Sequence, residues 1–397
     1  MLCPRVADYA VTHSTTTSLR RVAVLSDGMG ASRDAVLRGL FAFARQLPSW
    51  VLHLDRPDTR RHANLSRWNP DGLIACLSDQ QQADSVLKLR KPVVNVTGVL
   101  DVPSVPRVSV DDRAVGMMAA EHLLDQGLRE VACLTGSSSG HCDERMAGFV
   151  EFCQQHAVAC AVHVQKEPES CRVDDDFGVW LARLPKPAGL FTTLDSLGQI
   201  ATERAIEAGM QVPDELAIVT AGDDANLCEI TRPPLSALKL PLEQAGYEAA
   251  SLLDRLMDGA VAPAQPRMLP PMHVVTRQST DIVAVDDPEL ARAIALIRKH
   301  SGKSLTVKDI LREVPVSRRA LEMRFRSLLG RSPMEEIRRV QFNAAKRMLI
   351  DTEDPVWRVA EKCGYSSSAY LSVVFRHQLE IGPAAYRRQF RMPGAAS

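Results

Sequence analysis

The chain has 397 residues, 45% of them hydrophobic, and its 48 Lys and Arg are balanced by 48 Asp and Glu. A chain of this length is too long to fold around one ordinary hydrophobic core, which predicts two or three domains. The absence of a membrane-length apolar run, of a signal peptide and of any C-x-x-C pair among the nine cysteines argues against membrane, exported, zinc-ribbon and disulfide-framework proteins. We expect a cytoplasmic protein with reduced thiols, no metal and no cofactor.

We divide the chain into three parts. Residues 1–19 are interpreted as a disordered tail or the product of an upstream start, 20–281 as an α/β domain, and 282–397 as an all-helical domain. In the α/β part, apolar runs of strand length alternate with amphipathic helices, as in the helix that carries Val36, Leu37 and Leu40. The predicted strands are 22–25, 51–54, 72–77, 93–96, 131–134, 161–164, 189–192 and 217–220.

This alternation predicts parallel sheets covered by helices on both faces. The strands are too many for one sheet, so we predict two such sub-domains in succession. Ligands of these sheets bind beyond the carboxyl ends of the strands. The polar residues that follow strands, and are therefore candidate contacts, are Ser26, Asp27, Asn95, Thr97, Ser137 to Ser139, Arg145, Asp195, Asp223 and Asp224. Carboxylates, hydroxyls and a guanidinium in facing crevices suit a polyhydroxylated small molecule.

The C-terminal part contains one helical unit written twice. Ser317, Leu321, Phe325 and Pro333 recur fifty residues later as Ser367, Leu371, Phe375 and Pro383. Such a fixed-offset match indicates a duplicated unit. Each copy predicts a short helix (306–314 and 355–363), a tight turn and a second helix, which is the helix-turn-helix plan for DNA major grooves.

Charge separates the two halves of the chain. Residues 286–397 hold 21 Lys and Arg against 13 Asp and Glu, a net charge of +8, and the preceding residues carry −8. A basic solvated surface would explain the charge alone. Charge together with a duplicated helix-turn-helix favours a nucleic-acid partner.

At this point the sequence resembles known families. The α/β part resembles the periplasmic-binding-protein-like effector domain of the LacI type, and the C-terminal part resembles the AraC-type DNA-binding domain. The combination is similar to the group of xylose operon regulators. The words that carry the resemblance are 70–74 (PDGLI), 91–94 (KPVV), 108–111 (VSVD), 144–149 (ERMAGF), 212–214 (VPD), 277–280 (RQST) and the duplicated C-terminal unit.

The resemblance implies the contacts of the sugar. It matches the family's crevice arginine to Arg145 and its ligand-facing aspartate to Asp195. The alternatives are a surface helix arginine for Arg145 and a helix N-cap for Asp195. The family's aspartate after the last strand is replaced here by Gly222, and the acids are displaced to Asp223 and Asp224. Together with Asp27, Ser137 and Asp223, which follow predicted strands, Arg145 and Asp195 make up the expected ligand contacts.

The resemblance also implies the DNA contacts. Base-reading positions fall on Arg319, Glu322 and Met323, because arginine bonds guanine bidentately and glutamate accepts from cytosine. Arg318 and Arg326 are expected at phosphates. Packing is the alternative role for Met323, since Leu321, Phe325 and Leu328 are expected to form the core. The second helix offers Ser368, Ala369, Ser372, Val373 and Arg376, and we expect it to discriminate less.

Caps and spacing complete the prediction for this domain. Asp287 with Pro288 predicts a helix start, and Ser332 to Glu335 predicts a capping box that opens a helix through about residue 350. That helix is roughly 27 Å long, comparable with the roughly 34 Å between successive major grooves, so both readers can reach one side of a duplex. Glu380 stands where the first copy has Gly330, which is unfavourable for a left-handed cap.

Our hypothesis is a DNA-binding transcription regulator that responds to a small sugar, with xylose as the leading candidate. Its expected partners are a double-stranded DNA operator, the sugar, a second copy in a homodimer, and RNA polymerase if it is an activator; no membrane partner is expected. The rivals are a sugar-binding transport protein and an enzyme with a DNA-binding appendage. No P-loop, nucleophile elbow or other catalytic set occurs in the sequence.

Overall fold

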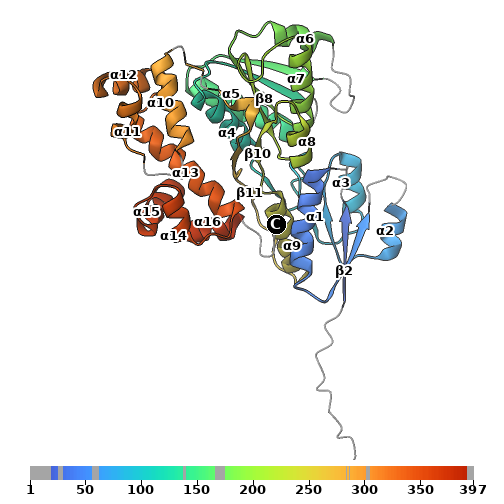
Figure 1. Cartoon of the computed structure of the whole chain (residues 1–397). Coiled ribbons are helices and arrows are strands. Elements are labelled where there is room, and N and C mark those ends of the chain that lie inside the picture. Colours follow the sequence, from blue (N-terminus) through green and yellow to red (C-terminus); the bar gives the residue numbers. More distant parts are fainter. Residues whose placement is uncertain are drawn as a thin grey trace, which may run out of the picture.

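The computed structural model describes residues 19–25, 30–55, 62–136, 140–165, 175–282, 284–285, 287–300 and 305–390. Of the expected sites, the 1–18 tail, Ser26, Asp27 and Ser137 to Ser139 lie outside these ranges. In the described part, no helix has the length and apolar character needed to cross a membrane. Figure 1 shows two α/β lobes and a separate helical module beside them.

Lobe 1 is built on a parallel four-stranded sheet in the order β2-β1-β3-β4. Its strands contain continuous apolar runs because helices cover both faces. Its elements are β1 (Arg20–Leu25), α1 (Ala31–Ala44), β2 (Trp50–Asp55), α2 (His62–Trp68), β3 (Gly72–Ala75), α3 (Gln80–Leu87), β4 (Val93–Asn95), α9 (Leu242–Met257) and the parallel pair of β5 (Val108–Val110) with β11 (Arg267–Leu269).

Lobe 2 is built on a six-stranded sheet in the order β12-β10-β9-β8-β6-β7, parallel except for β12. Its elements are α4 (Asp112–Asp125), β6 (Glu130–Gly136), α5 (Gly140–Gln155), β7 (Cys160–Gln165), α6 (Asp175–Ala182), β8 (Ala188–Thr192), α7 (Asp195–Glu207), β9 (Leu216–Ala221), α8 (Ala225–Ile230), β10 (Ser236–Lys239), β12 (His273–Val275) and η1 (Gln278–Thr280).

The prediction of two sub-domains in succession is wrong, because the chain returns to lobe 1 after β10. The helix α9, which follows lobe 2 strands in sequence, buries Ala245, Ala249 and Leu253 in the lobe 1 core. It packs on α1 with backbone in contact: a Cβ on Gly39 would lie 1.7 Å from the Glu243 carbonyl oxygen. The lobes are therefore joined by several crossing segments, an arrangement that permits one lobe to move against the other.

The helical module contains two helix-turn-helix units joined by a long helix, so the predicted fold class is confirmed. Its helices are α10 (Pro288–Lys299), α11 (Val307–Glu313), α12 (Arg318–Leu329), α13 (Pro333–Asp351), α14 (Val356–Lys362), α15 (Ser368–Leu379) and α16 (Pro383–Phe390). Each unit has its own apolar cluster, one around Phe325 and one around Phe375, and α13 contributes to both.

The caps form as predicted. Asp287 accepts hydrogen bonds from the first-turn amides of α10, and Ser332 with Glu335 forms a reciprocal capping box on α13. Gly330 and Glu380 both take left-handed conformations, with φ of 70° and 60°. One packing prediction changes: Leu329 is buried in the core of the first unit, whereas Leu328 is only partly buried.

Candidate effector cleft and DNA-reading face

Arg145 lies at the boundary between the lobes and is buried. It projects from α5 with only 7% of its surface exposed. Its Nε donates to Asp112 Oδ1 at 2.8 Å and its Nη1 donates to the Thr193 carbonyl oxygen at 2.7 Å. The alternative of a surface helix arginine is therefore wrong, while contact of Arg145 with a ligand stays a prediction.

Asp112, the first residue of α4, brings a buried carboxylate to the same place. Burial raises the pKa of Asp112 above its usual value, and the adjacent Arg145 opposes that rise. A Cβ on Gly98 of lobe 1 would lie 2.9 Å from Asp112 Oδ2, so the lobes meet at this carboxylate. Asp112 is absent from the contacts expected from sequence, although it follows β5 and the strand-end rule applied to the other strands would have found it.

Asp195 is the first residue of α7, so it is not the N-cap. Leu194 holds that position without a side-chain hydrogen bond, and Asp195 Oδ1 accepts from the Ser196 amide at 2.9 Å. Burial raises the pKa of Asp195, and the Ser196 amide works against that rise. Burial removes the water that stabilises a charged carboxylate, and hydroxyl groups of a ligand can stabilise the charge in place of that water by donating hydrogen bonds.

Gly222 explains the departure from the family pattern. It takes a positive φ of 98°, and a Cβ there would lie 3.3 Å from Asp195 Oδ2. The glycine thus gives the backbone a conformation that side chains disfavour and leaves room for the Asp195 carboxylate. The displaced acid Asp223 pairs with Arg277 Nη2 at 2.8 Å. Asp223 therefore lies near the cleft already engaged in an ion pair within lobe 2.

The other expected polar residues divide by location. Asn95 is buried, and its side chain accepts from the amides of Leu77, which follows β3, and Thr97, which follows β4, and donates to the Leu100 carbonyl oxygen, so it joins the loops after two strands. His141, a neighbour not expected from sequence, has a pKa lowered to about 3 by burial and by Arg145, which keeps it uncharged. Asp27 and Ser137 lie outside the described residues.

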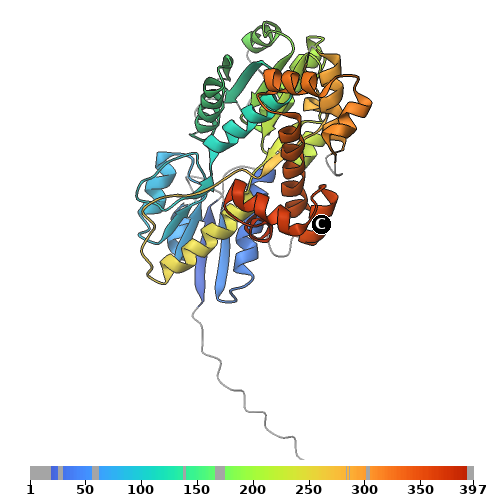
Figure 2. The same ribbon diagram turned by 90° about the vertical axis from the view of Figure 1, so that its left-hand side faces the viewer.

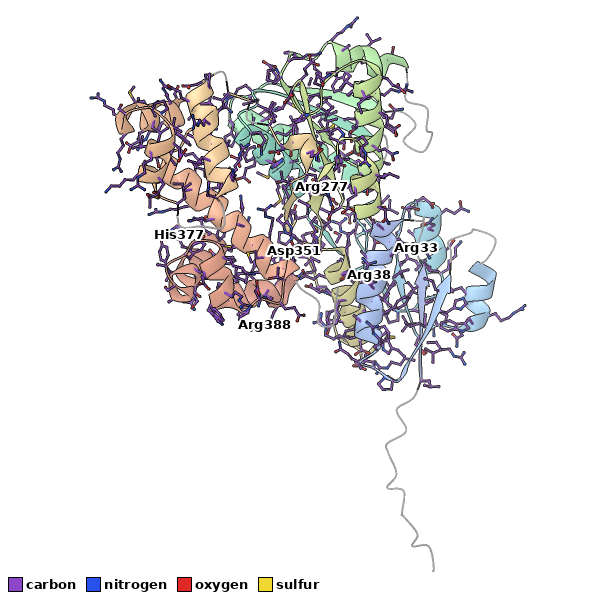
Figure 3. The ribbon with its side chains drawn as sticks, viewed as in Figure 1. Arg33, Arg38, Arg277, Asp351, His377 and Arg388 are labelled. Carbon is purple, nitrogen blue, oxygen red and sulfur yellow. The ribbon has the colours of Figure 1, made fainter. Side chains whose placement is uncertain are left out.

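A cavity of about 590 Å³ opens beside this cluster. Asp223 and Asp224 from lobe 2, Ser32 and Arg38 from α1 of lobe 1, and Asp351 from the helical module line it. Figure 3 shows Asp351 at the side of the helical module that faces the lobes, and Arg38 on α1 of lobe 1. A volume of this size is typical of small-molecule sites. Arg145 and Asp195 are outside its lining, but Asp223 of the lining follows Gly222, where a Cβ would lie 3.3 Å from Asp195 Oδ2.

The predicted DNA-reading residues of the first unit lie on one exposed face of α12. Arg318, Arg319 and Arg326 are exposed. Met323 is 60% exposed, so its alternative role in packing is wrong. Arg318 Nε lies 3.3 Å from Glu322 Oε1, one turn along the helix. In Figure 1, α12 and α15 lie on the side of the module away from the sensor lobes.

The second unit exposes a different surface. Val373 is 58% exposed, and Ala369 and Arg376 are exposed as well. Ser368 is half-buried, and Ser372 donates its hydroxyl to the Ser368 carbonyl oxygen at 2.8 Å, inside its own helix. Tyr370, which was not expected from sequence, is 44% exposed. Arg376 is the one lysine or arginine in the sequence of α15.

Comparison with known proteins finds family models that match two parts of the chain. A periplasmic binding protein-like domain matches residues 120–280 and a helix-turn-helix domain matches residues 310–389. The xylose operon regulatory protein of Escherichia coli strain K12 is 26% identical over 382 residues, covering 94% of this chain and 97% of that protein. The protein of the same name from Haemophilus influenzae is 27% identical over 330 residues, covering 80% and 84%.

Solved structures show the same architecture. A xylose-binding transcription activator matches with a TM-score of 0.62 and 24% identity, covering 95% of this chain and all of that one. A LacI family regulator from Enterococcus faecium with bound ribose matches with a TM-score of 0.55 and 20% identity, covering 66% of this chain and 98% of that one. The second match covers a share of the chain that corresponds in length to the sensor lobes without the C-terminal module.

Proposed function

We propose that this chain, which combines a LacI-type sensor with an AraC-type helix-turn-helix module as xylose operon regulators do, is a sugar-responsive DNA-binding transcription regulator. Its effector is a small sugar, and the relatives that align along nearly the whole chain favour xylose. Those relatives are regulators, so we do not assign enzymatic turnover to the cleft. The function is exercised in the cytoplasm, where the operator DNA is.

The observation that carries the proposal is a buried hydrogen-bonding cluster and an exposed basic helix in one chain. Asp112 and Asp195 supply acceptors, and Arg145 supplies a fixed fork of donors, at the boundary of two lobes. A sugar presents hydroxyls that donate to carboxylates and accept from a guanidinium. Its binding between the lobes relieves carboxylates that burial has stripped of water, and this favours the closed arrangement of the lobes.

DNA recognition is assigned to the two reader helices. Arg319, Glu322 and Met323 face the bases from α12, Arg318 and Arg326 face phosphates, and α15 enters the next groove. The α13 helix of 19 residues spans roughly 28 Å, so one chain covers two successive major grooves. A homodimer covers a pair of such sites. If the chain is an activator, like the xylose-binding transcription activator whose structure it resembles, RNA polymerase is the further partner.

The proposal is tested by pairing a sugar screen with a DNA-binding assay. Thermal unfolding of the whole chain is followed with pentoses and hexoses, because a ligand of the folded state raises the melting temperature. Affinity for a duplex selected by the chain from a random pool is then measured with and without each hit. We expect D-xylose to raise the melting temperature and to change the DNA affinity.

Arg145→Ala provides the test of the cleft. It should abolish the calorimetric xylose signal, and the free protein should remain folded by circular dichroism. Arg204→Ala, which removes a half-buried arginine that pairs with Glu207 on the same helix α7, is the matched control and should titrate as the wild type does. A xylose titration unchanged by Arg145→Ala would reject the placement of the sugar at this cluster.

A further inference from the structure

One helix reaches from the candidate effector cleft to the DNA-binding module. The first residue of α4, Asp112, bonds Arg145 in the cleft, and its last residue, Asp125, is an ion-pair partner of Arg331 and Arg339 in the module. Its 14 residues span about 20 Å. The two ends of one rigid element thus lie at the two places that an effector response has to connect.

The contact at the Asp125 end is a buried cluster of alternating charges. Arg331 Nη2 donates to Asp125 Oδ1 at 2.7 Å, and Arg339 pairs with the other oxygen of the same carboxylate. Both arginines also bond Glu336, at 2.6 Å and 2.8 Å, and Glu336 is fully buried. Burial alone would raise the pKa of Glu336, but Arg339 and Arg331 hold it below the usual value. A desolvated cluster of this kind tolerates few alternative geometries, because each charge needs all its partners.

Further hydrogen bonds join the same end of α4 to the module and its connector. Arg298 of α10 donates to the Asp125 carbonyl oxygen at 3.0 Å and to the Ile282 carbonyl oxygen at 2.7 Å. The Ala284 amide donates to the Gln126 carbonyl oxygen at 2.9 Å. The C-terminal end of α4 is therefore bonded to the connector, to α10 and to α13.

At its other end, α4 moves with the helix that carries Arg145. A Cβ on Gly116 would lie 1.9 Å from the Arg145 carbonyl oxygen, and one on Gly148 would lie 2.0 Å from the Arg113 carbonyl oxygen. With backbone against backbone, α4 and α5 cannot slide past each other without a clash. A displacement of Arg145 by a ligand is consequently passed to the whole of α4.

The module has a second attachment that does not involve α4. Asp351, the last residue of α13, pairs with Lys239 of β10 at 2.9 Å. Figure 2 shows α13 extending between the upper and lower parts of the module along the sensor. A cavity of about 520 Å³, lined by both α4 and α13, lies along the interface and leaves space for the two helices to shift. Movement of α4 relative to the sheet would therefore tilt α13 and the reader α12 that precedes it.

We infer that α4 couples the effector cleft to the DNA readers, with Asp125, Arg331, Arg339 and Glu336 as the positioning residues at the module end. The inference rests on the proposed function, since it assigns a route to that response. The cluster lies apart from the exposed faces of α12 and α15, so the sensor alters the orientation of the readers without covering them. An interface between α4 and α13 that has two stable packing arrangements would suffice for the switch.

Asp125→Asn is the decisive variant, because it keeps the shape and one acceptor oxygen but removes the charge that both arginines share. DNA affinity is measured on a duplex selected from a random pool by the wild-type chain, with and without D-xylose. Couplings between sites commonly amount to about 5- to 150-fold, and we expect the xylose effect on DNA affinity to fall to within about twofold in the variant. Calorimetry should still detect xylose binding.

Asp254→Asn is the matched control. Asp254 is a partly buried carboxylate in lobe 1 that pairs with Arg20 at 3.0 Å, and its loss should leave the xylose effect on DNA binding at the wild-type ratio. Hydrogen exchange of the wild-type chain provides a readout that does not depend on how the variant folds. Xylose should change the exchange of amides in residues 331–340.

The outcomes separate the two proposals. A wild-type chain whose DNA affinity does not respond to xylose would overturn the proposed effector and the coupling that rests on it. A wild-type chain that responds, with an Asp125→Asn variant that responds equally, would overturn the coupling alone. Unchanged exchange in residues 331–340 on xylose binding would do the same.

Discussion

The two reader helices occupy equivalent places in a repeated fold, yet their exposed chemistry differs. Both begin after a serine cap, Ser317 and Ser367, and both bury a leucine and a phenylalanine at matching positions fifty residues apart. Packing thus fixes the inward half of each helix in the same way. Position in the fold alone would predict equal roles for α12 and α15.

The outward halves diverge. At the fifty-residue offset Arg319 becomes Ala369, Glu322 becomes Ser372 and Met323 becomes Val373, while Arg326 keeps its counterpart Arg376. The Ser372 hydroxyl donates a hydrogen bond to the Ser368 carbonyl oxygen of its own helix. The shared arginine offers both helices a phosphate contact, but only α12 offers a bidentate donor for a base. The duplicated scaffold therefore sets where the helices sit, and a few exposed side chains determine how much each one reads.

Arg319→Ala should have the largest effect, because it gives α12 the residue that α15 already carries. Loss of a bidentate base contact should cost about 1–3 kcal/mol on a selected duplex and relax preference at one base pair. Fluorescence anisotropy with the selected and a scrambled duplex measures it. The reciprocal variant Ala369→Arg should leave affinity at least as high and add a base preference in the second half-site. Equal losses on both duplexes would contradict base reading by Arg319.

The shared arginines provide the next comparison. Arg326→Ala and Arg376→Ala should each weaken binding to selected and scrambled duplexes alike, since a phosphate contact carries no sequence information. Each should lower the slope of log Kd against log salt concentration by about 1. Titrations at several salt concentrations measure the slopes. A sequence-dependent loss for Arg376→Ala, with none for Arg326→Ala, would show that α15 reads bases after all.

Met323→Val should have a smaller effect, again by making α12 resemble α15. The side chain is exposed, so folding should change little, and a thymine-methyl contact would lose only part of its apolar area. We expect less than about 1 kcal/mol of binding energy to be lost, on the scale of one buried methylene. The loss is measured with the selected duplex and with a series of duplexes in which one thymine at a time is replaced. A loss as large as that of Arg319→Ala would contradict this prediction, because it would require Met323 to be fully enclosed at the DNA surface.

Much of the fold could be predicted from local pattern. Buried strands such as Val22 to Leu25 show as continuous apolar runs, and the helical module shows as a repeat with caps at Asp287 and Ser332. The return of α9 to lobe 1 could not be predicted in this way. Its partners on α1 lie about two hundred residues earlier, and no local pattern reports which sheet an amphipathic helix covers.

The DNA-reading face could be predicted from local pattern, whereas the effector cleft and the contact between the domains could not. Exposure of Arg319 and Met323 follows from helical period, because Leu321 and Phe325 fix the inward face. The partners of Arg145 depend on the meeting of α4, α5 and the end of β8, which are separate in sequence. Glu336 is an acidic residue in the first turn of α13, where the sequence alone would predict exposure, yet it is fully buried and pairs with two arginines. Charges buried between domains are recognisable only once the domains are placed together.

The smallest expected effect concerns the cap that follows each reader. Gly330 and Glu380 both adopt positive φ, but only glycine does so without a steric cost, so Glu380→Gly should stabilise the second unit. The greater freedom of glycine in the unfolded chain offsets part of the gain, which leaves about 0.5 kcal/mol. Native-state hydrogen exchange at amides of α15 and α16 measures the local opening free energy in the whole chain. Gly330→Ala is the reciprocal variant and should lower the protection of α12 and α13 by a comparable amount. If Glu380→Gly lowered protection in α15, the side chain of Glu380 would have to stabilise the turn through a contact that outweighs its strained backbone.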